Sequence, residues 1–220
     1  MTPEKVTLGI DTAGGVAAAA LTSDAHGVST TDSQALEGLL PCVRRALASI
    51  DRELSAVSAI AVCIGPGSFT GLRIGVAFAK SLAQALGVAA VGISSFDIVT
   101  SVRAAIEGAP PRVAVVQGKR GFYYARIATP IDTPPIAVAG DRGVLIDAAR
   151  EALGTQAGES ELAGALAAVD CGPDVRAVAA ARLGRAALDA GASGDWRCLA
   201  IEYGQRPNAV VNWELRHGPA

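Results

Sequence analysis

A glycine-rich segment, residues 64–75, carries the residue types and spacing that could do chemistry. It reads Ile-Gly-Pro-Gly-Ser-Phe-Thr-Gly-Leu-Arg-Ile-Gly and joins an apolar, β-branched run to a helix-like pattern. Its glycines relax the backbone, and the hydroxyls of Ser68 and Thr70 stand at the expected start of the helix. Exposed amides at a helix N-terminus attract anions, so the segment could bind a phosphate or carboxylate group. A tight turn with a purely structural role explains the same residues equally well.

Two common phosphate-binding motifs do not fit this segment. A P-loop needs Lys and then Ser or Thr directly after its last glycine, whereas Leu72 and Arg73 follow Gly71. The dinucleotide fingerprint needs its second and third glycines three residues apart, whereas Gly67 and Gly71 are four apart. An anion or nucleotide site here would therefore depend on other groups, and its candidate residues are Asp11, Thr12, Gly65, Gly67, Ser68, Thr70 and Gly71.

Asp11 is the best acidic candidate, because it ends the first expected strand where a turn could face a ligand. Capping that turn is the alternative role, and a common one for Asp. The comparable position of the second half is Gln117, and an amide is neither a general base nor as strong a metal ligand as a carboxylate. The two histidines, His26 and His217, stand near opposite ends of the chain, which disfavours a paired-histidine metal site or a Ser-His-Asp triad. We therefore expect no catalytic residue, no metal ligand and no cofactor.

The apolar runs predict the elements that would position these residues. Runs at 6–11 and 16–21 flank the paired glycines of residues 12–15 and predict a β-hairpin, with a third strand near Val28. Residues 59–64 predict a central strand buried on both faces. The glycine-rich segment then follows the carboxyl end of a strand, where open α/β sheets bind their ligands.

Two amphipathic helices are predicted on either side of that strand. Apolar residues recur at helical spacing from Leu36 to Ile50, with Pro41 near the start, and again over residues 72–86. In the second helix a row of small residues at steps of four (Gly75, Ala79 and Ala83) would let another helix approach closely. Packing onto the chain's own sheet explains the same pattern, so both alternatives stay open.

Strands and helices continue to alternate along the rest of the chain. We expect strands at 88–93, 113–116 and 122–127, helices at 96–106 (entered through Ser94 or Ser95), 144–153 and 173–188, a loop at 130–135, and a loosely patterned stretch at 154–172. A break at 108–111 predicts two lobes, an N-terminal lobe of residues 1–107 and a smaller, diverged lobe of residues 108–220.

Composition narrows the class of protein. Half of the 220 residues are hydrophobic, enough for a core, and the formal net charge is −2. Because no dense cluster of Lys or Arg appears, we do not expect nucleic-acid binding by this chain alone. The four cysteines, at 42, 63, 171 and 198, form no close pair, which favours a reducing compartment. With neither a signal peptide nor a long uncharged apolar span in the sequence, we expect a cytoplasmic protein that does not contact a membrane.

Three segments taken together closely resemble the TsaB (YeaZ) family: Ile-Asp-Thr at 10–12, Leu-Leu-Pro at 39–41, and residues 65–75. The resemblance runs from residue 6 to 127, includes Val-Gly-Ile-Ser-Ser at 91–95, and continues weakly to Tyr203. It implies an α/β protein with the actin-like ATPase (ribonuclease H-like) fold, in which two lobes hold mixed sheets flanked by helices.

The resemblance also implies a function. It points to a non-catalytic scaffold or activator, an inactive paralogue of TsaD, in the complex that adds threonylcarbamoyl to adenosine 37 of certain tRNAs. The implied partners are a TsaD-like catalytic subunit, a TsaE-like ATPase and a second copy of the chain, with tRNA bound only through the complex. Family helices equivalent to the first two form subunit contacts, so the implied interface residues are Leu39, Leu40, Val43, Leu47, Leu72, Gly75, Val76, Ala79 and Ala83. The alternative is an autonomous actin-fold ATPase or small-molecule kinase that uses Asp11 and the glycine-rich segment.

The chain departs from the family pattern at three places. Ala35 replaces a usual His, Gln117-Gly118-Lys119 replaces Asp-Ala-Arg, and Tyr203-Gly204-Gln205-Arg206 replaces Tyr-Leu-Arg. These changes affect the expectation of any nucleotide-binding or second-lobe function. They do not affect the first-lobe helices on which the implied scaffold role depends.

Overall fold

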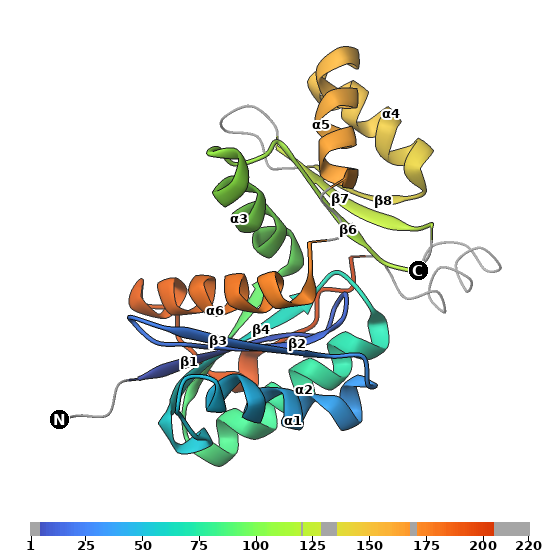
Figure 1. Ribbon diagram of the computed structural model, residues 1–220. Helices are drawn as coiled ribbons and strands as arrows, with labels where there is room; N and C mark the ends of the chain where they lie inside the picture. Colours follow the sequence, from blue (N-terminus) through green and yellow to red (C-terminus); the bar gives the residue numbers. More distant parts are fainter. Residues whose placement is uncertain (1–4, 120, 129–135, 168–170, 205–220) are drawn as a thin grey trace.

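The computed structural model describes residues 5–119, 121–128, 136–167 and 171–204. Within them, two sheets lie in two lobes (Figure 1). The strands are β1 (Val6–Asp11), β2 (Val16–Leu21), β3 (His26–Thr31), β4 (Val57–Gly65), β5 (Ala89–Ser94), β6 (Val113–Gln117), β7 (Tyr123–Ile127) and β8 (Ile136–Gly140). The helices are α1 (Ala35–Ala48), α2 (Phe69–Leu86), α3 (Ser95–Glu107), α4 (Arg142–Leu153), α5 (Thr155–Ala167) and α6 (Pro173–Asp189), with short 3-10 turns η1 (Leu54–Ala56) and η2 (Trp196–Cys198).

The first sheet has five strands in the order β3-β2-β1-β4-β5. The first three strands form an antiparallel meander, while β4 and β5 add in parallel to β1. β4 lies between β1 and β5 and is buried along most of its length, as a continuous apolar strand should be. The predicted hairpin, the third strand and the buried strand before the glycine-rich segment are confirmed.

Helices cover both faces of this sheet (Figure 1). α1 and α2 lie together on one face, where their buried apolar residues join those of the strands in the main core. Pro41 lies inside α1 rather than near its start, because the helix already begins at Ala35. α6 lies on the other face, so close that a Cβ on Gly9 would overlap the carbonyl oxygen of Ala177. Small residues on both sides permit this approach.

The second lobe is an antiparallel sheet in the order β6-β7-β8, with α4 and α5 packed on one face. Its core contains Val113, Val115, Ala125, Ile127, Leu145 and Leu162. α5 and β8 were not predicted, since α5 buries only Gly158, Leu162 and Ala165 and β8 is mostly exposed or half-buried, so neither shows a strong period. The predicted loop at 130–135 lies outside the described residues.

After α5 the chain returns to the first lobe. α6 packs against β1, β2 and β4, and farther on the amide of Glu202 donates to the carbonyl of Ile64, 2.8 Å away. The amphipathic pattern of a helix does not say which sheet it covers, so the sequence did not predict this return. The division of the chain into an N-terminal lobe (1–107) and a C-terminal lobe (108–220) stays a prediction. In space, α6 belongs with the first sheet.

Candidate functional site

A pocket of about 560 Å³ lies where the two lobes meet. It is lined by the turn after β1, by the segment leading into α1, by the start of α2 and by the end of β6. These lining residues are Thr12, Ala13, Gly14, Gly15, Val16, Thr31, Asp32, Ser33, Gln34, Ala35, Ser68, Thr70, Gly71, Ile74, Gln117 and Gly118. The N-terminal ends of α1 and α2 both reach this interlobe pocket, together with backbone from the second lobe.

Close contacts fix the start of α2 against the turn after β1. Ser68 caps the helix, because its Oγ accepts a hydrogen bond from the amide of Gly71 at 3.3 Å. The hydroxyl of Thr12 donates to the carbonyl of Gly71 at 2.8 Å, and the amide of Ser68 donates to the carbonyl of Ala13 at 2.8 Å. A Cβ on Gly71 or Gly75 would overlap Thr12. The glycines of this segment therefore serve close packing.

The candidate anion-site residues divide into two groups. Thr12, Ser68, Thr70 and Gly71 line the interlobe pocket, whereas Asp11, Gly65 and Gly67 are not among its lining residues. Gly65 has a φ of 112°, a backbone conformation that favours glycine, and its carbonyl accepts the Ser94 hydroxyl at 3.3 Å. Gly67 lies so close to Ala13 that a Cβ would collide with it.

Asp11 is fully buried, and its carboxylate has partners within the chain. Its Oδ1 accepts the amide of Ala13 at 2.7 Å, which is the capping role left open by the sequence. Its Oδ2 accepts the Nε–H of Arg176 at 2.5 Å. The acid singled out from the sequence is therefore part of a buried ion pair.

Arg176, in the first turn of α6, was missed by the sequence analysis. It is 5% exposed, and its Nη2 donates to the Ser95 hydroxyl at 3.5 Å and lies 3.9 Å from the sulfur of Cys63. Burial alone would lower the pKa of this guanidinium, but the charge of Asp11, the neighbouring Cys63 and Cys171 and the hydrogen bond to Asp11 together outweigh burial and raise the pKa. A signal was available, since Arg176 falls at steps of four with Ala180 and Gly184, both on the buried side of α6.

Cys63 and Ser95 complete this buried cluster. The Cys63 sulfur lies 3.0 Å from the Ser95 hydroxyl oxygen. Burial raises the pKa of the Cys63 thiol to about 12, and the negative charge of Asp11 acts in the same direction. The thiol therefore stays protonated at neutral pH, so it is not set up as a nucleophile.

In the described ranges no three His, Cys, Asp or Glu side chains gather as metal ligands. The described helices include none long and apolar enough to cross a bilayer. The interlobe pocket offers hydroxyls and the N-terminal ends of α1 and α2, which suit a small polar or anionic group, together with the carboxylate of Asp32, which repels an anion.

Most residues expected at a partner interface are buried within the chain. Leu40 is 38% exposed, and the remaining residues of this set are buried: Leu39, Val43, Leu47, Leu72, Gly75, Val76, Ala79 and Ala83. The row of small residues in α2 lies against the chain's own sheet and Thr12. This is the internal packing that was the alternative to a partner helix. A partner contact through α1 and α2 stays a prediction, and it would have to use their exposed residues.

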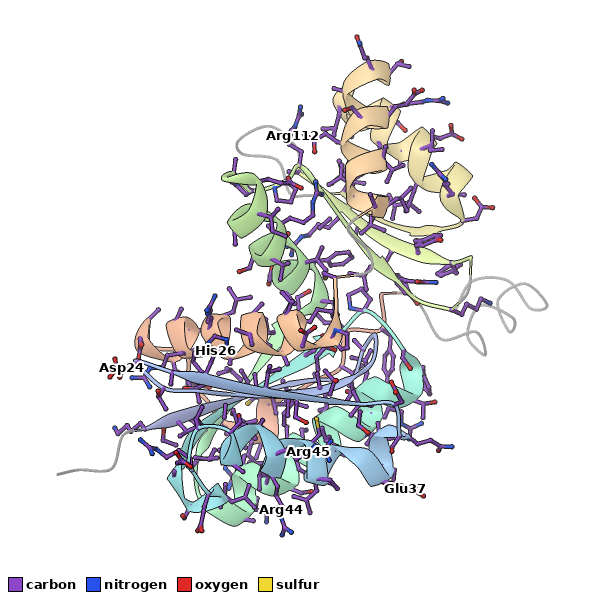
Figure 2. All side chains as sticks on the ribbon, in the orientation of Figure 1. Asp24, His26, Glu37, Arg44, Arg45 and Arg112 are labelled. Atoms are coloured by element: carbon purple, nitrogen blue, oxygen red, sulfur yellow. The ribbon has the colours of Figure 1, made fainter. Side chains whose placement is uncertain are left out.

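The exposed residues of these helices include apolar ones near the pocket. Leu36 is 77% exposed and Phe69 is 56% exposed, at the beginnings of α1 and α2. The Phe69 ring stacks on Tyr203 with centroids 5.1 Å apart, and the guanidinium of Arg73 lies 5.4 Å from the Phe69 centroid. Glu37 and Arg44 project from the outer side of α1 (Figure 2). We call Leu36, Leu40, Phe69 and Arg73 the exposed helix surface.

Comparison with known proteins identifies the family. The family model described as TsaD, tRNA N6-adenosine threonylcarbamoyltransferase, matches residues 13–132, more than half of the 220-residue chain. The chain belongs to the TsaD family. The matched range begins in the turn after β1 and contains the glycine-rich segment, so the family signature covers most of the interlobe pocket.

Within the TsaD family the chain is of the TsaB (YeaZ) type. It is 31% identical over 121 residues to the tRNA threonylcarbamoyladenosine biosynthesis protein TsaB of Escherichia coli, covering 53% of this chain and 52% of that protein. The solved structure of YeaZ from Pseudomonas aeruginosa aligns with a TM-score of 0.50 and 26% identity, over 62% of this chain and 67% of that one. The predicted family and the actin-like, ribonuclease H-like fold are confirmed.

Members named as the transferase match over a shorter stretch. The tRNA N6-adenosine threonylcarbamoyltransferase of Moorella thermoacetica is 47% identical over 58 residues, 26% of this chain and 17% of that protein. The chain spans about half the length, or less, of the curated relatives it matches.

Proposed function

We propose that this TsaD-family chain is a TsaB-type subunit that supports the formation of threonylcarbamoyladenosine in tRNA. The observation that carries the proposal is its similarity to E. coli TsaB, a protein named for that biosynthesis. In this role the chain binds a TsaD-type catalytic subunit in the cytoplasm and contacts tRNA only through the complex. A TsaE-type ATPase and a second copy of the chain are the further partners we expect.

The geometry around Asp11 supports a supporting rather than a catalytic role. Asp11, the acid at the end of β1, already accepts hydrogen bonds from Ala13 and Arg176, so it is not free to act as a general base. His26 is exposed at the far end of β3 from the interlobe pocket (Figure 2). His217 lies outside the described residues.

The exposed helix surface is our candidate for the contact with the catalytic subunit. Leu36 and Phe69 are large apolar side chains left in solvent, and Arg73 lies beside the Phe69 ring. Exposed apolar groups beside an arginine and an aromatic ring are the composition that interface centres favour. Their neighbours on the inner sides of α1 and α2 hold the helices to the sheet.

Depletion of the chain in its own cells tests the proposal. The threonylcarbamoyladenosine content of total tRNA, measured by mass spectrometry of nucleosides, should fall on depletion and recover with the wild-type gene. Rescue by Leu36→Asp with Phe69→Asp should fail, because charges on the exposed helix surface would weaken the contact. Ile106→Asp on α3, at an equally exposed apolar residue, is the matched control and should rescue. An unchanged nucleoside content after depletion would contradict the proposed function.

An autonomous ATPase or small-molecule kinase is the second candidate, and the interlobe pocket is the observation in its favour. Its volume and its hydroxyls could accept a nucleotide phosphate. Against it, the described residues that line the pocket include no Lys or Arg. Calorimetric titration of the isolated chain with ATP and magnesium separates the two, since heat of binding at the pocket, lost on Thr12→Val, would favour the kinase.

A further inference from the structure

A buried polar cluster lies directly behind the interlobe pocket and draws its members from four elements. Asp11 ends β1, Cys63 lies in β4, Ser95 begins α3 and Arg176 lies in the first turn of α6. Asp11 is fully buried and Arg176 is 5% exposed, so neither charge is solvated by bulk water. These two residues are 165 positions apart in the sequence, and their ion pair fastens α6 to the first strand.

Hydrogen bonds connect this cluster with the wall of the pocket. Arg176 donates to Asp11, and Asp11 accepts the amide of Ala13. The carbonyl of Ala13 in turn accepts the amide of Ser68, the residue that caps α2. The first turn of α6 also touches the loop directly, because a Cβ on Gly15 would lie 3.1 Å from Pro173. The guanidinium is therefore linked through Asp11 to the turn of residues 12–15 and to the start of α2.

A buried carboxylate requires a positive partner, which is either a metal ion or a cationic side chain. The neighbours of Asp11 do not suit a metal ion. Hard cations prefer several oxygen ligands, whereas the groups around Arg176 are one carboxylate, the Ser95 hydroxyl, the protonated thiol of Cys63 and the thiol of Cys171. The guanidinium already fills the place such an ion would need. The metal binding that membership of the TsaD family suggests does not fit at Asp11.

We propose that Arg176 is the positioning residue of the interlobe pocket, a built-in cation that holds Asp11, and through it the turn of residues 12–15, without a metal ion. Removal of its charge frees the Asp11 carboxylate to leave the amide of Ala13. The turn then loses its attachment to the start of α2, and the pocket loses its shape. This inference does not depend on the proposed function, because it concerns the free chain.

Hydrogen exchange of single amides, measured by NMR on the full chain, tests the proposal. Arg176→Met should speed the exchange of the Ala13 and Ser68 amides by tenfold or more relative to the amides of α4 in the second lobe. Arg176→Lys keeps a charge and should restore part of the protection. Arg185→Met is the matched control, because Arg185 lies on the same helix in an exposed pair with Asp189, and it should leave these amides unchanged. Wild-type protection of both amides in folded Arg176→Met would overturn the proposal.

Two further measurements keep the test decisive if Arg176→Met does not fold. The double variant Asp11→Asn with Arg176→Met carries no unpaired charge and should melt at a higher temperature than Arg176→Met alone. A double variant no more stable than the single one would overturn the proposal, since Arg176 would then act through its own packing. Titration of the wild-type chain with magnesium or manganese should give the same result as titration of Asp11→Asn. Cation binding that disappears in Asp11→Asn would also overturn it.

Discussion

Among single residues, Thr12 determines which side chains can replace the glycines at the start of α2. Its backbone and hydroxyl lie against Gly71 and Gly75, at a distance that leaves no room for a Cβ on either. Behind it, Asp11 combines the capping of the turn with an ion pair to Arg176. The segment in which the sequence predicted an anion site is thus also a close packing contact between α2 and the turn after β1.

Gly75→Ala is the first prediction. The added Cβ would overlap the Thr12 hydroxyl, so we expect the free energy of unfolding to fall by about 1 to 3 kcal/mol, the usual cost of overpacking. Gly164→Ala in α5 is the control, because the nearest atom to its Cβ is 3.5 Å away and alanine is the better helix former. Urea unfolding measures both changes. Equal effects of the two substitutions would contradict the packing account.

A second prediction concerns alkaline pH. The pKa of Cys63 is raised from its ordinary 9.0 to about 12, so between these values the thiol is neutral in the folded chain and ionised in the unfolded one. The unfolded state then binds fewer protons, so this group's contribution to stability is full below pH 9 and is lost as the pH rises toward 12. Urea unfolding of Cys63→Ala at several pH values should show a shallower fall than wild type. An equally steep fall in Cys63→Ala and in the wild type would contradict this assignment.

Among the elements, the helices on the two faces of the first sheet come from different parts of the chain. α1 and α2 cover one face of the first sheet and come from the chain directly around β4, whereas α6 covers the other face after the chain has built the second lobe. α6 reaches the sheet through small residues, with Ala177 packed against Ala17 and Ala19 of β2. Arg176 lies on the side of α6 that faces this sheet and pairs with Asp11 of β1. The packing of α6 on the sheet and the buried ion pair therefore depend on each other.

Ala177→Leu tests this layer and is the third prediction. Ala177 is fully buried between α6 and the sheet, so a larger side chain should push the helix outward and lower the free energy of unfolding by about 1 to 3 kcal/mol. Val175→Leu, at a residue 43% exposed on the same helix, should change it by less than about 0.5 kcal/mol. Thermal melts of the two variants give the comparison, and equal melting temperatures would speak against close packing of α6.

The sequence predicted helices and strands best where the apolar residues of the element recur with a clear helical or strand period. The runs from Val6 to Ile127 correspond to strands and helices in the order expected, and the family resemblance rests on the same stretch. α5 and β8 were not predicted, because few of their residues are buried. Arg176 was missed for another reason. Its spacing with Ala180 and Gly184 indicates a buried position, but no local pattern predicts its contact with Asp11, 165 residues away.

At the scale of the whole molecule, α3 and β6 join two lobes that both contribute to one pocket. Gln117 and Gly118 of the second lobe face Thr12 and Ser68 of the first across it. Arg126 of β7 pairs with Asp97 of α3 at 2.6 Å, and Arg103 of α3 donates to the Val113 carbonyl at 2.7 Å. These contacts hold the second lobe to α3. As proposed, the exposed helix surface then presents the first lobe to a catalytic subunit.

Reconstituted transfer of threonylcarbamoyl to tRNA is the decisive test of the proposed supporting role. The purified chain, its cognate TsaD-type and TsaE-type subunits, tRNA and the activated threonylcarbamoyl donor are combined, and the modified nucleoside is measured with and without this chain. We expect product formation to fall at least tenfold when the chain is omitted, and the chain alone to form none. Equal product with and without the chain would show that the chain has no supporting role in the transfer.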